Sequence, residues 1–479
     1  MSNPSSFYWH DYETWGAQPS VDRPAQFAGL RTDLDFNPVG EPLVVYARPA
    51  DDFLPQPQAC MITGITPQHA ADTGAPEAEF FRFIHGELSK PGTCALGYNS
   101  LRFDDEVTRY GLYRNFFDPY EREWKNGNSR WDMIDVVRLT RALRPGGINW
   151  PQKEEGVTSF RLEDLTAAND IEHSGAHDAL VDVKATISLA RLVRDRQPKL
   201  FEFVFNNRDK HKLAAQLNVR AGQPVLHVSA RYPARLGCIA TVVPLAVHPT
   251  NRNGVIVYDL RTDPAALLEM SAEEIRARLY TATADLPEGV ERIPLKVVHL
   301  NRAPVIVPMG TLSDAAREEW QMDAVAEQRH LEMLRNAIGL SEKLIQVFDA
   351  RDQFPPQSDP DRDLYGSFLS DDDRRRCEQV RRAPADELAS LHPDFDAAKL
   401  HELLFRYRAR NWPETLNRQE RLRWEEYRRE RLTEPGAGGS IVLEDYRRQL
   451  SRLVVDTSLT PAQRAVVDAL LDWPAELGL

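Results

Sequence analysis

The chain has 479 residues, of which 42% are apolar and 27% are charged, so it has the composition of a folded globular protein of about three domains of ~150 residues. Its formal net charge of −13 excludes nonspecific adhesion to nucleic acid or membranes through global charge, and any polyanion must be held locally. No stretch approaches the ~18 apolar residues of a membrane span, and the four scattered cysteines form no zinc or disulfide pattern. We expect a cytoplasmic protein.

The first part of the chain alternates strand and helix signals. Strands are predicted at residues 7–13, 25–32, 43–48 and 94–97. Helices are predicted at about residues 76–89, 102–115, 131–143, 161–169 and 177–196. This order predicts an α/β fold, in which helices cover a mixed sheet.

A β-rich region follows the break in the helical pattern at Gln197-Pro198. Strands are predicted at residues 225–228, 238–245, 254–259, 295–300 and 304–307, with helical insertions at about 272–280 and 316–348. Residues 353–363 contain three prolines among polar residues, which predicts an extended linker, and the chain beyond it is helical and charged. We therefore predict three domains, at residues 1–197, 198–352 and 353–479.

Two acids lie on the first predicted strand. Asp11 and Glu13 are two residues apart, so both side chains face the same side of the strand, about 7 Å apart along the backbone. Carboxylates on an apolar, central strand are costly to bury unless they are paired or bind a metal ion. The pair alone is weak evidence, because Asp-x-Glu also arises by chance in an acidic chain.

A third acid lies in the middle of this region. Asp104 falls at the start of a predicted helix, where the helix dipole also favours an acid without any catalytic role. Asp105 and Glu106 are the neighbouring alternatives, and the spacing does not choose among the three.

The last predicted helix adds a histidine and an acid. His177 and Asp182 are five residues apart, which on a regular helix separates their side chains by about 140°. They act together only if His177 lies at or before the helix start, which Ser174-Gly175 allows. Asp178 and Asp182 form a competing i, i+4 pair.

Together these residues give the order Asp-x-Glu, Asp and His-x4-Asp, which resembles the DEDD-type 3′ to 5′ exonucleases with a histidine base. Met61-Ile-Thr-Gly-Ile-Thr-Pro67 is a further mark of these enzymes, in which this loop lies near the 3′ end of the substrate; an ordinary glycine turn has the same pattern. Five longer motifs extend the resemblance, to the bacterial exodeoxyribonuclease I family, over nearly the whole chain: Arg23-Pro-Ala-Gln-Phe, Asn99-Ser-Leu-Arg-Phe-Asp-Asp-Glu-Val-Thr-Arg, Leu143-Arg-Pro-Gly-Gly-Ile-Asn-Trp-Pro, His248-Pro-Thr-Asn-Arg-Asn and Leu404-Phe-Arg-Tyr-Arg-Ala-Arg-Asn.

The resemblance implies a ribonuclease H-like exonuclease domain, an SH3-like β-rich domain and an all-helical C-terminal domain. It implies a processive 3′ to 5′ exonuclease of single-stranded DNA, acting in DNA repair and recombination, that releases 5′-mononucleotides by two-metal-ion hydrolysis. Two Mg²⁺ ions, for which Mn²⁺ can substitute, are expected on Asp11, Glu13, Asp104 and Asp182. His177 is the expected general base, since histidine ordinarily titrates near neutrality. The enzyme is expected to be a monomer.

The resemblance also implies contacts to the DNA strand, which single-strand binders make with a local basic groove and stacking aromatics. The expected residues are Glu13, Arg109, Tyr120, Trp124, Arg138, Phe160 and Arg161 in the first domain, Lys210, Asn253 and Asn301 in the second, and Tyr365 and Phe368 in the third. For any one aromatic, core packing is the alternative. The arginine-rich stretch from His401 to Arg431 could face DNA, but a helix pair with surface salt bridges explains most of it better.

A partner is implied as well, namely the acidic C-terminal tail of single-stranded DNA-binding protein. Arg144 and Arg335 match two basic positions of the family's pocket for this tail, whereas Pro308 and Ser313 stand where amide and basic side chains are expected. Two other functions stay open. An RNA-trimming exoribonuclease of the same superfamily would not need the roughly 280 extra residues, and a catalytically silent single-strand-binding adaptor would not need all five catalytic positions.

Overall fold

The computed structural model describes residues 4–175, 177–349 and 357–479. The chain forms two compact units, and each is described here by itself. Unit 1 comprises the described parts of residues 131–172 and 188–355, and unit 2 those of residues 2–130, 173–187 and 356–479. Each unit combines distant parts of the chain, and the domain limits predicted at 197 and 352 stay predictions. Within the described ranges, no helix combines the length and the apolar character needed to cross a membrane.

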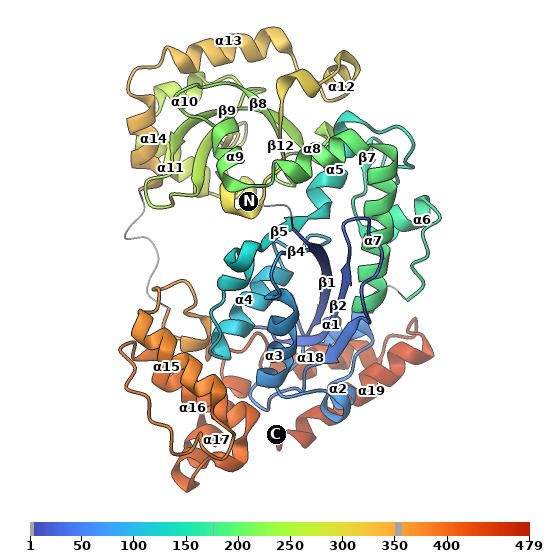
Figure 1. Cartoon of the computed structure of the whole chain (residues 1–479), viewed down its shortest axis with the longest axis vertical. Helices are drawn as coiled ribbons and strands as arrows, with labels where there is room; N and C mark the ends of the chain where they lie inside the picture. Colours follow the sequence, from blue (N-terminus) through green and yellow to red (C-terminus); the bar gives the residue numbers. More distant parts are fainter. Residues whose placement is uncertain (1–3, 176, 350–356) are drawn as a thin grey trace. The chain divides into compact units, whose positions relative to one another are not determined.

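A five-stranded mixed sheet carries the first acids (Figure 1). Its strand order is β3-β2-β1-β4-β5, and β1 runs antiparallel to β2 and parallel to β4. The strands are β1 (Ser6–Thr14), β2 (Pro24–Thr32), β3 (Leu43–Tyr46), β4 (Thr93–Gly97) and β5 (Ser129–Asp132). The mixed α/β sheet predicted from the sequence is confirmed.

The fifth strand corrects one prediction. Its residues overlap the helix predicted from residue 131, but Ser129 to Asp132 are all buried and extended. The helix α5 (Met133–Leu143) begins after them, because the side chain of Asp132 accepts a hydrogen bond from the backbone of Ile134 and caps the helix.

The central strand β1 extends beyond its parallel neighbour. Residues 6–9 of β1 pair with residues 93–96 of β4, and only β2 accompanies the rest of β1. At the end of β4, a Cβ on Gly97 would lie 2.5 Å from the carbonyl oxygen of His10, so only glycine lets the two strands approach this closely. Asp11 and Glu13 therefore lie past the carboxyl end of β4.

The helices of unit 2 in this part of the chain are α1 (Pro57–Thr63), α2 (Pro67–Thr73), α3 (Glu77–Leu88), α4 (Asp104–Arg114) and the start of α7 (Ala179–Arg196). Unit 1 contains α6 (Leu162–Ala168) and a short hairpin of β6 (Gln152–Glu154) and β7 (Val157–Thr158). Helices α3, α4, α6 and α7 lie close to the predicted positions. Helices α1 and α2 were not predicted. They meet in the Thr-Gly-Ile-Thr loop, where Gly64 ends α1 with φ of 71° and Thr66 caps α2.

Unit 1 contains the predicted β-rich region. Its antiparallel sheet has the order β11-β10-β9-β8-β12, with β8 (Val225–Val228), β9 (Ile239–Val247), β10 (Gly254–Asp259), β11 (Leu295–His299) and β12 (Ile306–Pro308). The helices of this region are α8 (Pro198–Asn206), α9 (Lys210–Gln216), α10 (Ala265–Glu269), α11 (Ala272–Tyr280), α12 (Asp314–Glu319), α13 (Ala324–Arg335) and α14 (Leu340–Phe348). Leu344 and Val347 of α14 pack with Ile256 of β10 in its core.

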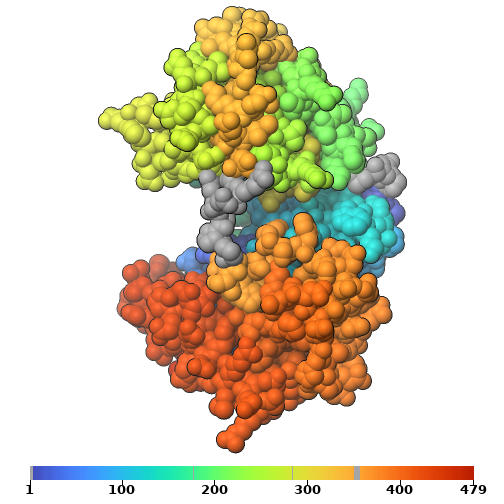
Figure 2. All heavy atoms as spheres, turned by 90° about the vertical axis from the view of Figure 1, so that its left-hand side faces the viewer, coloured from blue at the N-terminus to red at the C-terminus, as the bar shows by residue number. Residues whose placement is uncertain are grey.

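The C-terminal region is all-helical, as predicted, and Figure 2 shows it as a broad surface coloured orange to red. Its helices are α15 (Asp371–Arg382), α16 (Lys399–Asn411), α17 (Arg418–Thr433), α18 (Leu443–Val454) and α19 (Pro461–Glu476). Two hydrophobic cores of unit 2 combine this region with the start of the chain. One joins Trp15 and Cys60 to Leu470, and the other joins Tyr113 to Leu404.

The predicted linker at 353–363 is partly wrong. Residues 353–356 lie outside the described residues, but the chain from Asp359 is packed, with a short 3₁₀ helix at Pro360–Arg362. Asp361 is 2% exposed and pairs with Arg406 and Arg410 of α16. Charge pairing with a later helix, rather than the proline content, decides the structure here.

Candidate active site

All five predicted catalytic residues lie in unit 2 and come from three parts of the chain. Asp11 and Glu13 are on β1, and Asp104 is the first residue of α4. His177 lies two residues before α7, and Asp182 is in the first turn of that helix. The side-chain ligand atoms of Glu13, His177 and Asp182 all lie within 4.8 Å of one another. The carboxylate Oδ1 of Asp104 accepts a hydrogen bond of 3.1 Å from the backbone of Tyr12, between the two acids of β1.

The structure distinguishes the three consecutive acids of α4. Asp104 repels the charges of Asp11 and Glu13. Asp105 turns away into a buried ion pair with Arg122 and Arg130, at 2.6 Å from each.

Glu106, the third acid, is occupied elsewhere. It pairs with Arg109 at 2.9 Å and accepts a hydrogen bond from Tyr365 at 2.5 Å. Asp104 is therefore the member of the acidic triplet that faces the β1 acids.

His177 lies before the helix start, as its pairing with Asp182 requires, because α7 begins two residues later. Between them, Asp178 caps the helix, and its Oδ1 accepts hydrogen bonds from the backbones of Leu180 and Val181 at 3.0 and 3.2 Å. In the alternative pair of Asp178 and Asp182, the carboxylate of Asp178 is thus engaged in capping the helix. His177 itself has a left-handed backbone, with φ of 71°.

The electrostatics of the cluster favour bound cations. Burial, followed by repulsion from Asp182, Asp104 and Asp178, raises the pKa of Glu13 to about 9. Burial and repulsion from Asp104 and the neighbouring acids likewise raise the pKa of Asp11 well above its usual range. Carboxylates in this state gain most from a divalent ion, whose preferred ligands are oxygens.

Sequence reasoning missed His173. Its Nε2 lies 2.5 Å from Oδ1 of Asp182, and its side chain is 6% exposed. A histidine four residues before His177 was visible in the sequence, but nothing in that spacing indicates that its partner is Asp182. A hydrogen bond of this kind orients the carboxylate of Asp182.

Four aromatic residues that were predicted to contact DNA lie in unit 2. Phe368 is 84% exposed, Trp124 64% and Tyr365 53%, so these rings are not core residues. Tyr120 and Phe368 meet edge to face at 6.3 Å between ring centroids. The group offers flat apolar surfaces to solvent.

Arg109 does not share this exposure. It is 5% exposed, and Glu123 binds its guanidinium through two hydrogen bonds of 2.7 and 3.0 Å. Arg109 also pairs with Glu106 and donates a hydrogen bond to the hydroxyl of Tyr365. Its guanidinium carbon lies 5.5 Å from the ring centroid of Tyr120. In this structure it supports the aromatic group rather than projecting to solvent.

Apart from Glu13 of β1, the other predicted DNA contacts belong to unit 1. Phe160 and Arg138 form a cation–π contact of 5.6 Å, and Arg161 is exposed at the start of α6. Lys210 begins α9, which packs on the turn at Leu300–Arg302 that contains Asn301. The carbonyl of Asn253 accepts a hydrogen bond from the backbone of Leu300, so Asn253 lies beside the turn that contains Asn301.

The predicted partner residues also lie in unit 1. Arg144 is exposed and donates a hydrogen bond to the carbonyl of Thr311 at 3.1 Å, beside Pro308 and Ser313. Arg335 is exposed and donates to the carbonyl of Gly222 at 2.9 Å.

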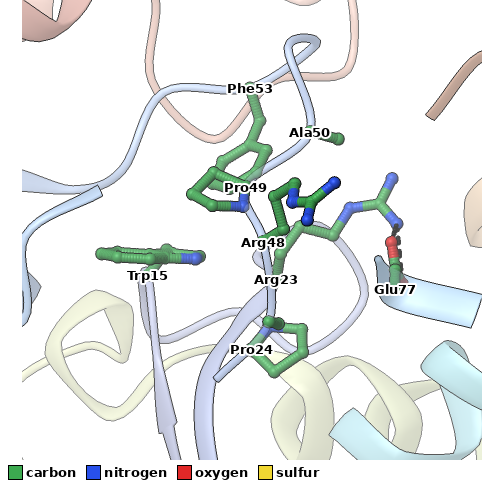
Figure 3. Close-up of a pocket in the computed structure, with 9 residues that line it drawn as sticks. Trp15, Arg23, Pro24, Arg48, Pro49, Ala50, Phe53 and Glu77 are labelled. Atoms are coloured by element: carbon green, nitrogen blue, oxygen red, sulfur yellow. Dashed lines mark hydrogen bonds and ion pairs between the residues drawn. The ribbon is translucent and has the colours of Figure 1, made fainter. Parts of the chain in front are cut away.

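A small cavity lies elsewhere in unit 2 (Figure 3). Trp15, Pro49 and Phe53 line one side, and on the other Arg23 turns to Glu77, with which it pairs at 2.8 Å. Its volume is about 10 Å³, whereas ligand sites usually have ~300 to 1,000 Å³, so it is a packing gap and not a ligand site.

Comparison with known families agrees with this fold and site. Residues 8–190 match the family model described as Exonuclease, residues 208–350 the Exonuclease I SH3-like domain, and residues 358–477 the Exonuclease I C-terminal domain. Such a chain is an exonuclease of three joined modules.

The relatives identify the family more closely. The chain is 46% identical to exodeoxyribonuclease I of Escherichia coli K12 over 99% of its length and 98% of the relative, and 44% identical to the Haemophilus influenzae enzyme over the full length of both. The chain belongs to the exodeoxyribonuclease I family.

Solved structures give the same result. Exonuclease I from Methylocaldum szegediense is 54% identical, with a TM-score of 0.95 over 98% of this chain and 99% of that one. The zinc-bound complex of E. coli exonuclease I with single-stranded DNA is 45% identical, with a TM-score of 0.94 over 99% and 100%. The SSB/Exonuclease I structure with the inhibitor CFAM is 44% identical, with a TM-score of 0.91 over the same shares.

Proposed function

We propose that this protein is a 3′ to 5′ exonuclease of single-stranded DNA that releases 5′-mononucleotides. The observation that carries the proposal is the cluster of Glu13, His177 and Asp182, whose ligand atoms lie within 4.8 Å of one another. Asp11 and Asp104 lie close enough for their charges to repel those of the cluster. The choice of substrate is supported by the E. coli relative, whose structure was solved in complex with single-stranded DNA.

Divalent cations fit this cluster, because burial and then repulsion between its carboxylates raise the pKa values of Asp11 and Glu13, and a bound cation offsets both effects. Asp11, Glu13, Asp104 and Asp182 would hold two Mg²⁺ ions, with Mn²⁺ as a substitute. Bound ions would activate water and stabilise the leaving 3′ oxygen.

His177 would act as the general base. A base must lie within hydrogen-bonding reach of the proton that it removes, and the ring of His177 lies beside the carboxylates of Glu13 and Asp182. In this role a ring nitrogen takes the proton of the attacking water. The variant His177→Ala should bind DNA with unchanged affinity and cleave it slowly, and an unchanged rate would exclude the role.

The exposed aromatic rings of unit 2 would hold the strand. A base stacked on an aromatic side chain contributes about 1 to 3 kcal/mol irrespective of sequence, which suits an acidic protein that lacks global attraction for DNA. Trp124, Tyr365 and Phe368 are the exposed candidates. Lys210, Asn253, Asn301, Arg138, Phe160 and Arg161 are proposed to contact the strand from unit 1.

The test is digestion of matched oligonucleotides labelled at the 3′ or the 5′ end. DNA and RNA, single and double stranded, are incubated with Mg²⁺ or with EDTA. We expect mononucleotide release from the 3′ end of single-stranded DNA with Mg²⁺ alone. Preferential digestion of RNA would favour the exoribonuclease, and binding without any metal-dependent cleavage would favour the silent adaptor.

We also propose that Arg144 and Arg335 bind the acidic C-terminal tail of single-stranded DNA-binding protein. Support comes from their exposure and from the solved SSB/Exonuclease I pair. Fluorescence anisotropy with a labelled tail peptide should show weaker binding to Arg144→Ala and Arg335→Ala, while Arg382→Ala, an exposed arginine of α15, serves as the control. Processive cleavage, a monomeric state, a cytoplasmic location and a role in DNA repair and recombination are proposed from the same family membership.

A further inference from the structure

His177 occupies an unfavourable backbone conformation. Its φ of 71° lies in the left-handed region, which is unfavourable for a residue other than glycine. Such a conformation persists only where surrounding contacts fix it, and it is common at functional sites. The contacts that fix it here are therefore part of what makes His177 available.

Gln26 of β2 supplies these contacts. It is 1% exposed, and its Oε1 accepts a hydrogen bond of 3.1 Å from the backbone of Ala179, the first residue of α7. Its Nε2 donates to the hydroxyl of Tyr46 at 3.0 Å and to Oδ2 of Asp178 at 3.4 Å. The side chain thus binds both residues that directly follow His177.

The orientation of this amide is fixed by its partners. The backbone N–H of Ala179 can only donate, so it must face the oxygen of Gln26, and the NH₂ group then faces the carboxylate of Asp178. A carboxylate at position 26 could not donate to Asp178 and would add a charge to the cluster. Glutamine is the residue that satisfies both partners.

The register of the sheet places Gln26 beside the catalytic acids. Gln26 lies directly opposite Glu13 in the antiparallel pair of β1 and β2, so both side chains point to the same face. The same side chain therefore connects the strand that carries Glu13 with the helix start that carries His177. A rigid element that holds a base relative to a metal ligand fixes the catalytic geometry.

We propose that Gln26 is a positioning residue that holds His177 in its left-handed conformation beside Glu13. The inference rests on the proposed function, in which His177 is the base. Gln26 itself touches no reacting atom, and its effect on cleavage passes through His177.

The test is a double-mutant cycle on the full-length protein with single-stranded DNA and Mg²⁺. Gln26→Met keeps the length of the side chain and removes its three hydrogen bonds, so we expect kcat to fall roughly 10- to 100-fold, while KM and the affinity for DNA in EDTA change less than about twofold. In the His177→Ala background, the same substitution should change kcat by less than about twofold.

Asn128→Leu is the matched control. Asn128 is also 1% exposed and makes three hydrogen bonds to backbone groups, away from the cluster. It should lower the melting temperature and leave kcat unchanged. If Gln26→Met fails to fold, Tyr46→Phe removes one hydrogen-bond partner of Gln26 and should lower kcat about threefold, again only when His177 is present.

The outcomes separate this inference from the proposed function. A wild-type protein that does not digest single-stranded DNA would remove the proposed function, and the inference with it. A wild-type enzyme that is active, together with an unchanged kcat in Gln26→Met, would overturn the inference alone. An equal loss of kcat with and without His177 would also overturn it, because Gln26 would then act through another group.

Discussion

Arg410 of α16 lies in a buried charge network of unit 2. Its guanidinium lies 2.8 Å from Asp52 and 2.7 Å from Asp361, and the three side chains are 4%, 0% and 2% exposed. Asp52 follows the edge strand β3, and Asp361 precedes the C-terminal helices. Arg410→Met keeps the aliphatic stem and removes the charge, which leaves two buried carboxylates without their main partner.

The size of the loss follows from the remaining partners. Asp361 keeps Arg406 at 2.7 Å, whereas Asp52 keeps Arg431 at the longer distance of 3.7 Å. Breaking a buried pair by removing one partner costs about 3 to 5 kcal/mol, and the surviving pair places the expected value near 3 kcal/mol. At roughly 2 to 4 °C per kcal/mol, the melting temperature should fall by about 6 to 12 °C.

Thermal unfolding followed by tryptophan fluorescence is the assay, because Trp424 lies 5.7 Å from the guanidinium of Arg410. Arg429→Met is the control, since Arg429 is 61% exposed in its pair with Glu425 and exposed pairs contribute about 0 to 1 kcal/mol. If Arg410→Met lowers the melting temperature no more than the control does, the buried network does not join the two segments.

Four further outcomes are expected. Burial would raise the pKa of Asp52, but its arginine neighbours lower the pKa to about 2. The roughly 2 kcal/mol of folding stability that this carboxylate contributes is therefore present above pH 4 and is lost as the pH falls towards 2. Acid unfolding of the wild type should be steeper than that of Arg410→Met. Asp105→Asn should lower the melting temperature and leave the Mg²⁺ affinity measured by calorimetry unchanged, because Asp105 is in a buried ion pair. Asp104→Asn should weaken Mg²⁺ binding and leave the melting temperature unlowered. Because the pKa of Glu13 is raised to about 9, Mg²⁺ binding should release protons and tighten from pH 7 to 9; heats of binding that do not depend on the buffer would contradict this. Trp124→Ala should raise KM for single-stranded DNA about tenfold at unchanged kcat, and a KM equal to that of the wild type would exclude base stacking on Trp124.

Local patterns in the sequence predicted much of the fold around the site. The aromatic run of β1 and the helical periodicity of α3, α4 and α7 act within a few residues, so their positions were close to those observed. The two-residue spacing of Asp11 and Glu13 likewise fixed their common face. Ser129–Asp132 was merged with a helix because a short buried strand has no periodicity of its own.

Features that depend on distant partners could not be predicted. The choice of Asp104 over Asp105 requires knowing that Arg122 and Arg130 fold back onto Asp105. The left-handed backbone of His177 depends on contacts across the sheet, and the hydrogen bond of His173 to Asp182 depends on where α7 begins.

The predicted linker failed for the same reason. Its proline content is a local signal, but the arginines that bury Asp361 come from a helix 45 residues or more further along the chain.

The shared cores of unit 2 have a consequence for biosynthesis. Trp15, Ala25 and Cys60 are covered by residues of α18 and α19, which are translated some 400 residues later. The strand that carries Asp11 and Glu13 therefore emerges from the ribosome long before its core can close, and domains that fold during synthesis need their complete core. A nascent chain stalled before α18 therefore lacks the residues that cover Trp15, Ala25 and Cys60, and its β1 belongs to an unfinished fold.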